Sequence, residues 1–133
     1  MPLLLHIETA TDTCSAALSE NGKIIGLKET IGTRSHASVL AVFIDALLNE
    51  KKITVADLDA IAVSKGPGSY TGLRIGVATA KGLCYGADKP LISVNTLQSM
   101  ATAFVLNKKN KENCLFCPLI DARRMEVYFA LFD

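Results

Sequence analysis

The stretch from Lys65 to Gly76, Lys-Gly-Pro-Gly-Ser-Tyr-Thr-Gly-Leu-Arg-Ile-Gly, holds four of the nine glycines of this 133-residue chain. It follows an apolar segment typical of a strand and leads directly into a helical pattern. Glycine inside a helix costs about 1 kcal/mol relative to alanine. In a loop, glycine is used for positive φ or for close approach of two backbones. The sequence therefore predicts a strand, a tight turn and a helix, in which the glycines serve turn geometry or close packing.

Hydrophobic periodicity predicts three strands, followed by alternating helices and strands, along the first 107 residues. The chain should open with a three-stranded antiparallel meander, because the turn-forming pair Asn21-Gly22 joins two of its strands. Asn95 or Thr96 is a plausible cap for the last helix of this region. The expected strands are 3–9, 14–19, 23–29, 57–64 and 91–94, and the expected helices are 36–51, 71–86 and 96–106. This order, βββαβαβα, indicates an α/β fold with three antiparallel strands followed by parallel ones.

The last part of the chain has a different character. Residues 107–113 are polar and rich in lysine, and residues 115–121 and 126–132 read as two strands of a hairpin. A lone hairpin is marginally stable unless it packs on something. We therefore expect one lobe over residues 1–107, and a linker and first hairpin of a second, truncated lobe over residues 108–133.

Composition limits the possible partners. Fourteen basic and thirteen acidic side chains give a formal charge of +1, so the chain lacks the basic surface of a protein that binds nucleic acid alone. The apolar run at the N-terminus ends at Glu8, which is too short for a signal peptide or a membrane span. A cytoplasmic protein without a membrane partner is expected. The pair Cys114 and Cys117 has Cys-x-x-Cys spacing, which we interpret as coincidental, with redox and metal roles as the alternatives.

The first two helices carry more apolar surface than one sheet can cover. On helix 36–51 the apolar arc spans roughly 260°, about twice what packing on a sheet uses. On helix 71–86, small residues recur every four positions, a pattern suited to close helix contact. A neighbouring helix of the same chain could cover the excess, but a protein interface is the sharper hypothesis. Its expected positions are Val39, Val42, Phe43, Ala46, Gly72, Gly76, Thr79, Ala80 and Leu83.

The glycine-rich stretch does not match a nucleotide-binding pattern. A P-loop needs Lys-Ser/Thr after its last glycine, but Leu73-Arg74 follows Gly72. The spacing also fails the dinucleotide fingerprint. Ser69 and Thr71 are expected to cap their own helix, with an anion contact as the alternative.

Two other sets of residues are candidates for chemistry. Glu8, Thr11 and Asp12 lie in one turn whose composition suits contact with a metal-bound phosphate, although turn formation alone explains it almost as well. His6 is expected to pack within a strand, and His36 to lie near the start of a helix. No nucleophilic triad is visible.

Four motifs together carry a family resemblance: Leu5-His6-Ile7-Glu8-Thr9-Ala10-Thr11, Arg34-Ser35-His36, the Gly66–Gly76 string, and Asp121-Ala122-Arg123-Arg124 followed by Glu126-Val127-Tyr128. In this order the chain resembles the TsaB (YeaZ) family, which takes part in making threonylcarbamoyladenosine on tRNA. The resemblance spans nearly the whole chain. Its signature loop consists of Gly66, Pro67, Gly68, Ser69, Tyr70, Thr71 and Arg74.

The resemblance implies an actin and sugar-kinase type (ribonuclease H-like) lobe and a non-catalytic role. The related catalytic subunit TsaD has a His-x-x-x-His metal pair, which would fall here at Thr96 and Met100, and neither residue replaces an imidazole ligand. By resemblance, the chain would form a homodimer or bind TsaD through the two helices, act with TsaE, and meet tRNA only in that complex. It would bring no cofactor itself, and ATP or ADP would bind in the complex. Two alternatives remain. One is a small-molecule kinase or ATPase that uses Glu8, Thr11 and Asp12, and the other is a peptidase that acts on the partner.

Overall fold

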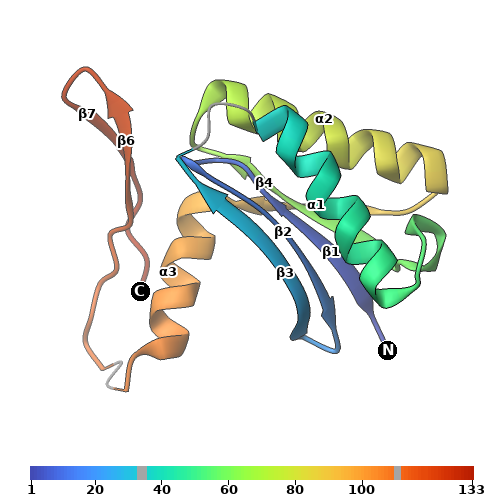
Figure 1. Cartoon of the computed structure of the whole chain (residues 1–133). Coiled ribbons are helices and arrows are strands. Elements are labelled where there is room, and N and C mark those ends of the chain that lie inside the picture. The colour runs from blue at the N-terminus through green and yellow to red at the C-terminus, as the bar shows by residue number, and fades with distance from the viewer. Residues whose placement is uncertain (33–35, 110–111) are drawn as a thin grey trace.

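A mixed five-stranded sheet forms the centre of the molecule, and a separate hairpin follows it (Figure 1). The computed structural model describes residues 1–32, 36–109 and 112–133. The strands are β1 (Leu3–Glu8), β2 (Thr13–Glu20), β3 (Lys23–Ile31), β4 (Ala60–Gly66), β5 (Leu91–Asn95), β6 (Leu119–Arg123) and β7 (Glu126–Phe129). The helices are α1 (His36–Lys51), the short 3-10 helix η1 (Val55–Asp57), α2 (Tyr70–Ala87) and α3 (Thr96–Asn107).

The strand order β3-β2-β1-β4-β5 places β1 at the middle of the sheet. β1 pairs antiparallel with β2 and parallel with β4, and β2 and β3 form an antiparallel hairpin. β5 pairs parallel with β4. The predicted meander followed by parallel strands is therefore confirmed.

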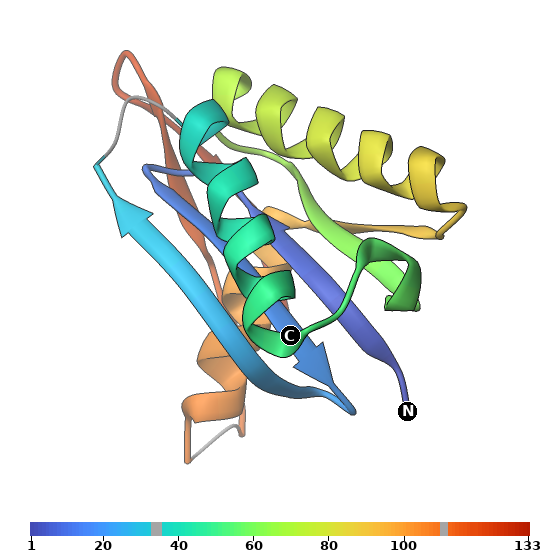
Figure 2. The ribbon, with the colours of Figure 1, turned by 45° about the vertical axis from the view of Figure 1, so that its right-hand side comes forward.

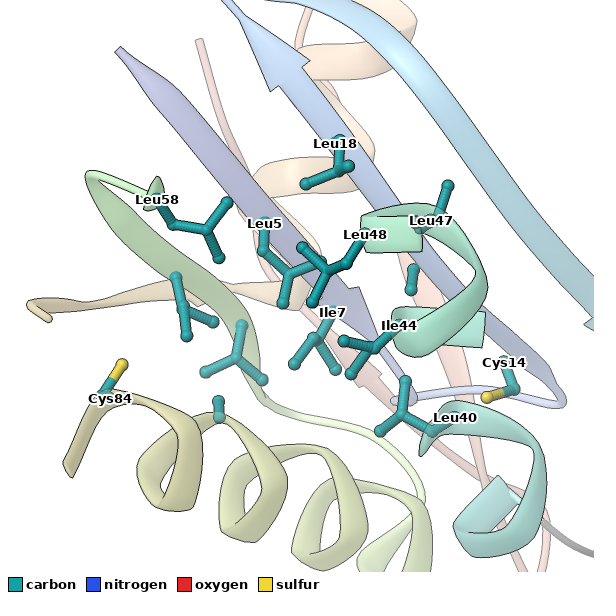
Figure 3. Packing of buried hydrophobic residues seen from close by; sticks show 14 residues of the cluster. Leu5, Ile7, Cys14, Leu18, Leu40, Ile44, Leu47, Leu48, Leu58 and Cys84 are labelled. Carbon is teal, nitrogen blue, oxygen red and sulfur yellow. The ribbon is translucent and has the colours of Figure 1, made fainter. Parts of the chain in front are cut away.

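Helices cover both faces of the sheet. α1 and α2 lie side by side on one face, and α3 lies on the other (Figures 1 and 2). Because side chains alternate along a strand, Leu5 and Ile7 of β1 point into the core under α1 and α2, whereas His6 and Glu8 point to the α3 side. Figure 3 shows Ile7 beside Ile44 and Leu5 beside Leu48, both of which belong to α1.

The strand expected at residues 57–64 starts later than predicted. Residues Val55–Asp57 form η1 instead, and β4 begins at Ala60. The carboxylate of Asp57 accepts hydrogen bonds from the backbone N–H and the hydroxyl of Thr54, at 2.7 and 2.9 Å. These bonds lower the pKa of Asp57. This capping box closes the turn, so the chain enters the sheet three residues later than hydrophobicity alone indicates.

The C-terminal hairpin forms, with shorter strands than predicted. The expected strand over 115–121 is wrong in its first half, because β6 begins at Leu119. Pro118 has no backbone N–H to give to a ladder. Before it, only Phe116 pairs, in an isolated bridge with Phe132. The hairpin forms a two-stranded sheet of its own, and the predicted domain division after residue 107 stays a prediction. None of the described helices is long and apolar enough to cross a membrane.

Candidate functional site

The turn between β4 and α2 is built against the end of β1. Gly66 has φ of +114°, a backbone conformation that residues other than glycine rarely adopt. Two residues later, a Cβ on Gly68 would lie 2.8 Å from the Cβ of Ala10. The backbone N–H of Ser69 donates to the carbonyl oxygen of Ala10 at 2.6 Å. The first part of the signature loop is therefore shaped by close contact with the β1–β2 loop.

Ser69 also begins α2. Its hydroxyl accepts a hydrogen bond from the backbone N–H of Gly72 at 3.2 Å, the geometry of a helix N-cap. The expectation that Ser69 caps the helix is confirmed, whereas Thr71 lies inside the helix and is exposed. Near the same end, the guanidinium of Arg74 lies over the ring of Tyr70, 5.5 Å from its centroid.

Thr9 joins α2 to the sheet by a hydrogen bond. Its hydroxyl is buried and donates to the carbonyl oxygen of Gly72 at 2.6 Å. A Cβ on Gly72 would collide with the backbone carbonyl of Thr9, and one on Gly76 would collide with the Thr9 hydroxyl. Both glycines are therefore required by a contact within this chain.

This contact corrects the predicted interface. Gly72, Gly76 and Ala80 are buried and face the sheet. The interpretation that they leave room for a second protein is wrong, because β1 occupies that room. Sequence periodicity located the stripe correctly but could not tell which face of α2 meets the sheet.

The opposite face of α2 is open. Winding the helix at about 100° per residue places Tyr70, Arg74, Lys81 and Tyr85 on one stripe, and all four are exposed. Tyr85 is 93% exposed. Thr79 and Leu83, which were predicted at the interface, are half-buried, and Leu83 packs against the core. Tyrosine and arginine are enriched at protein interfaces, and this stripe was missed because the small residues give the stronger periodic signal.

On α1, the apolar arc is divided between the core and the surface. The buried positions of this helix are His36, Leu40, Ile44, Leu47 and Leu48. Of the predicted interface residues, Val42 is 63% exposed, whereas Val39, Phe43 and Ala46 are half-buried. Phe43 packs against the core. Part of the excess apolar surface is therefore covered within the chain, and Val42 remains open.

The structure separates the three residues proposed to contact phosphate. Glu8 points to the α3 side of the sheet, where its carboxylate accepts hydrogen bonds from the hydroxyl of Ser64 and, at 2.8 Å, from the N–H of Ala10. Thr11 and Asp12 instead line a cleft that Glu8 does not reach. The two histidines have structural partners. His36, the first residue of α1, bonds the carbonyl oxygen of Thr11 at 2.9 Å, and His6 bonds the Ser19 hydroxyl at 2.7 Å.

The Ser19–His6 pair bears on the peptidase alternative. Ser19 is buried within β2, and burial lowers the pKa of His6. A serine nucleophile must be reachable by the substrate and its base oriented by a third group. The burial of Ser19 argues against such a role.

The cleft has a volume of about 630 Å³ and lies between the hairpin on one side and the β1–β2 loop and the start of α2 on the other. The β1–β2 loop contributes Thr11 and Asp12, and the start of α2 contributes Ser69, Tyr70 and Thr71. The hairpin contributes Asp121, Arg123 and Tyr128 from the other side. That the hairpin would complete a cleft with the β1–β2 loop was missed, because residues so far apart give no local signal.

Thr96 and Met100, the positions of the TsaD histidines, lie at the start of α3. Thr96 is buried, and Met100 lines the cleft. A hydroxyl and a thioether do not fit a metal site that needs two imidazole ligands.

Comparison with known proteins places the chain among its relatives. It is 39% identical over 128 residues to the tRNA threonylcarbamoyladenosine biosynthesis protein TsaB of Haemophilus influenzae, covering 96% of this chain and 52% of that protein. For TsaB of Escherichia coli the identity is 38% over 130 residues, covering 98% and 54%. A family model described as TsaD, tRNA N6-adenosine threonylcarbamoyltransferase, matches residues 14–133. The chain belongs to the TsaB (YeaZ) family.

Solved structures agree with this assignment. The structure of YeaZ from Pseudomonas aeruginosa superposes with a TM-score of 0.86 at 31% identity, covering 99% of this chain and 60% of that one. The fold is thus the expected actin-like (ribonuclease H-like) α/β lobe. The chain spans about half the length of the curated TsaB relatives it matches. Of the resembling motifs, Arg34 and Ser35 lie outside the described residues.

Proposed function

We propose that this chain is a non-catalytic subunit that binds and supports a TsaD-like enzyme in the transfer of threonylcarbamoyl to tRNA adenosine. The open outer face of α1 and α2 is the observation that carries the proposal. It presents exposed Val42, Tyr70 and Tyr85 beside the charges of Arg74 and Lys81. Apolar and aromatic groups with arginine at the edge are typical of protein interfaces.

The contact surface of this proposal differs from the one predicted by sequence. It keeps Val39, Val42, Phe43, Ala46, Thr79 and Leu83, adds Tyr70 and Tyr85, and omits Gly72, Gly76 and Ala80, which are buried within the chain. In isolation, the same surface would pair two copies of the chain.

Other members of the assembly follow from the family and from charge. With a formal charge of +1, the chain would meet tRNA only through the assembled complex in the cytoplasm. A TsaE-like ATPase would be the second partner, and ATP or ADP would bind in the complex. The engagement of Glu8 by Ser64 and Ala10 supports a chain that brings no cofactor of its own.

The proposal is tested by titrating the chain with a purified TsaD-like subunit in a calorimeter. Val42→Asp should weaken binding at least about tenfold, or about 1.4 kcal/mol, because it places a carboxylate in an apolar contact. Ile24→Asp is the matched control, since Ile24 on β3 is 61% exposed and Val42 is 63% exposed. Unchanged affinity of the Val42 variant, or equal losses in both variants, would contradict the proposed surface.

The kinase-like alternative draws support from the cleft, where Thr11 and Asp12 face the start of α2. It expects nucleotide hydrolysis by the isolated chain that Asp12→Ala abolishes. Hydrolysis that survives in this variant would not belong to the cleft, and binding to the TsaD-like subunit without hydrolysis would favour the subunit role.

A further inference from the structure

The segment that links α3 to the hairpin holds two of the four free cysteines. Cys114 is half-buried and Cys117 is exposed, whereas Cys14 and Cys84 lie in the core. Burial raises the pKa of Cys14 and of Cys84. Because the thiolate is the reactive form of cysteine, the two core thiols are poor nucleophiles.

A lysine lies beside the sulfur of Cys114. The Nζ atom of Lys108 donates to the Sγ atom of Cys114 at 3.4 Å. The same ammonium lies over the rings of Phe104 and Phe116, 5.8 and 5.7 Å from their centroids. These two rings pack edge to face with their centroids 5.8 Å apart. Two cation–π contacts therefore hold the ammonium at the sulfur.

The ammonium changes what the sulfur can do. At present the thiol also donates a weak hydrogen bond to the carbonyl oxygen of Glu112 at 3.6 Å. When the proton leaves, that bond is lost, but the hydrogen bond from Lys108 becomes a charge-assisted one. A positive group next to a cysteine favours nucleophilic attack by its sulfur.

Cys114 and Cys117 are both free thiols. Phe116 is held in strand geometry between them by backbone hydrogen bonds to Phe132, at 2.8 and 2.9 Å. The proposed disulfide partner of Cys114 is therefore another molecule.

We propose that Cys114 is the reactive thiol of this protein and exchanges with small anionic disulfides. In the reaction, the Cys114 sulfur attacks one sulfur of the disulfide and forms a new S–S bond as the old one breaks. The other half leaves as a thiolate, and the thiol proton of Cys114 passes to water. Lys108 positions the attacking sulfur and attracts the negative charge of the reagent.

The test uses the intact chain and the dianionic disulfide 5,5′-dithiobis(2-nitrobenzoate), with the modified cysteines quantified by peptide mapping at successive times. Exposure alone predicts that Cys117 reacts first, whereas this proposal predicts that Cys114 does. Lys108→Met should slow Cys114 about threefold, because the variant removes the ammonium that lies 3.4 Å from the attacking sulfur. Cys117 serves as the control within the same molecule, and its rate should not change.

Two further measurements keep the outcome decisive. Lys108→Arg should retain the fast rate, and a neutral reagent, 4,4′-dithiodipyridine, should show a smaller effect of Lys108→Met. Reaction of Cys14 or Cys84 would reveal an unfolded variant, in which case Lys108→Gln replaces it. The proposal is overturned if Cys117 reacts as fast as Cys114 in the parent, or if the ratio of their rates is the same without Lys108. An equal effect on both reagents would overturn the preference for anions.

Discussion

The two faces of α2 have opposite compositions and opposite surroundings. The inner face carries the buried residues Gly72, Gly76 and Ala80, and Gly72 and Gly76 lie directly against Thr9 at the end of β1. The outer face carries Tyr70 and Tyr85, which no element of the chain covers among the described residues. The buried small residues of this helix therefore serve the fold, and its two tyrosines remain free for a partner. A stripe of small residues marks close packing but does not say against what.

The largest effect on stability is expected when one methyl group is added to the inner face of α2. Gly72→Ala should lower the free energy of unfolding by about 3 kcal/mol, because its Cβ collides with the backbone carbonyl of Thr9. Gly82→Ala on the same helix is the matched control, since a Cβ at that position would meet nothing within 4 Å. It should raise stability by about 0.5–1 kcal/mol through its helix propensity. Urea denaturation measures both, and a loss of stability in both variants would contradict the asymmetry.

Removal of the Thr9 hydroxyl, on the β1 side of the same contact, should have a smaller effect on the free energy of unfolding. Thr9→Val should cost about 1–2 kcal/mol, because the hydrogen bond to the Gly72 carbonyl is lost without a change in volume. Thr9→Ser retains the hydroxyl and should lose less. Thermal unfolding of the two variants checks this order, and a Val variant as stable as the parent would show that shape alone holds the helix.

The smallest effect is expected on the outer face. Tyr85→Ser should change the free energy of unfolding by no more than about 0.5 kcal/mol, because the side chain is 93% exposed. The same variant should weaken binding to a TsaD-like subunit if this face is the contact surface. A loss of more than about 1 kcal/mol in urea denaturation would instead assign Tyr85 to the fold.

The elements were predictable where local signals were strong. The helix over residues 36–51 was predicted with both ends correct, since its apolar pattern is long and continuous. The turn at Asn21-Gly22 was equally clear, because both residues adopt the positive φ that such a turn requires. The start of β4 was not predictable from hydrophobicity, because the hydrogen bonds of Asp57 close a turn within an apolar run.

The candidate site was less predictable because its contacts join distant parts of the chain. Thr9 looked like a turn residue, and nothing nearby in sequence shows that its hydroxyl meets Gly72. Glu8 and Asp12 appeared as one acidic group, but the alternation of side chains along β1 sends Glu8 to the other face of the sheet. The helical period locates the stripe of small residues on α2. Whether that stripe faces the sheet or solvent depends on how the whole sheet assembles.

The Thr9 contact also bears on the order of folding. It joins residues 63 positions apart. The chain must therefore close a long loop, which costs conformational entropy, before this contact can stabilise the fold. The antiparallel meander of β1, β2 and β3 lies within the first 31 residues and can form from near neighbours. We therefore expect the meander to assemble early and α2 to dock late, so that substitutions at Gly72 and Thr9 should accelerate unfolding more than they slow folding.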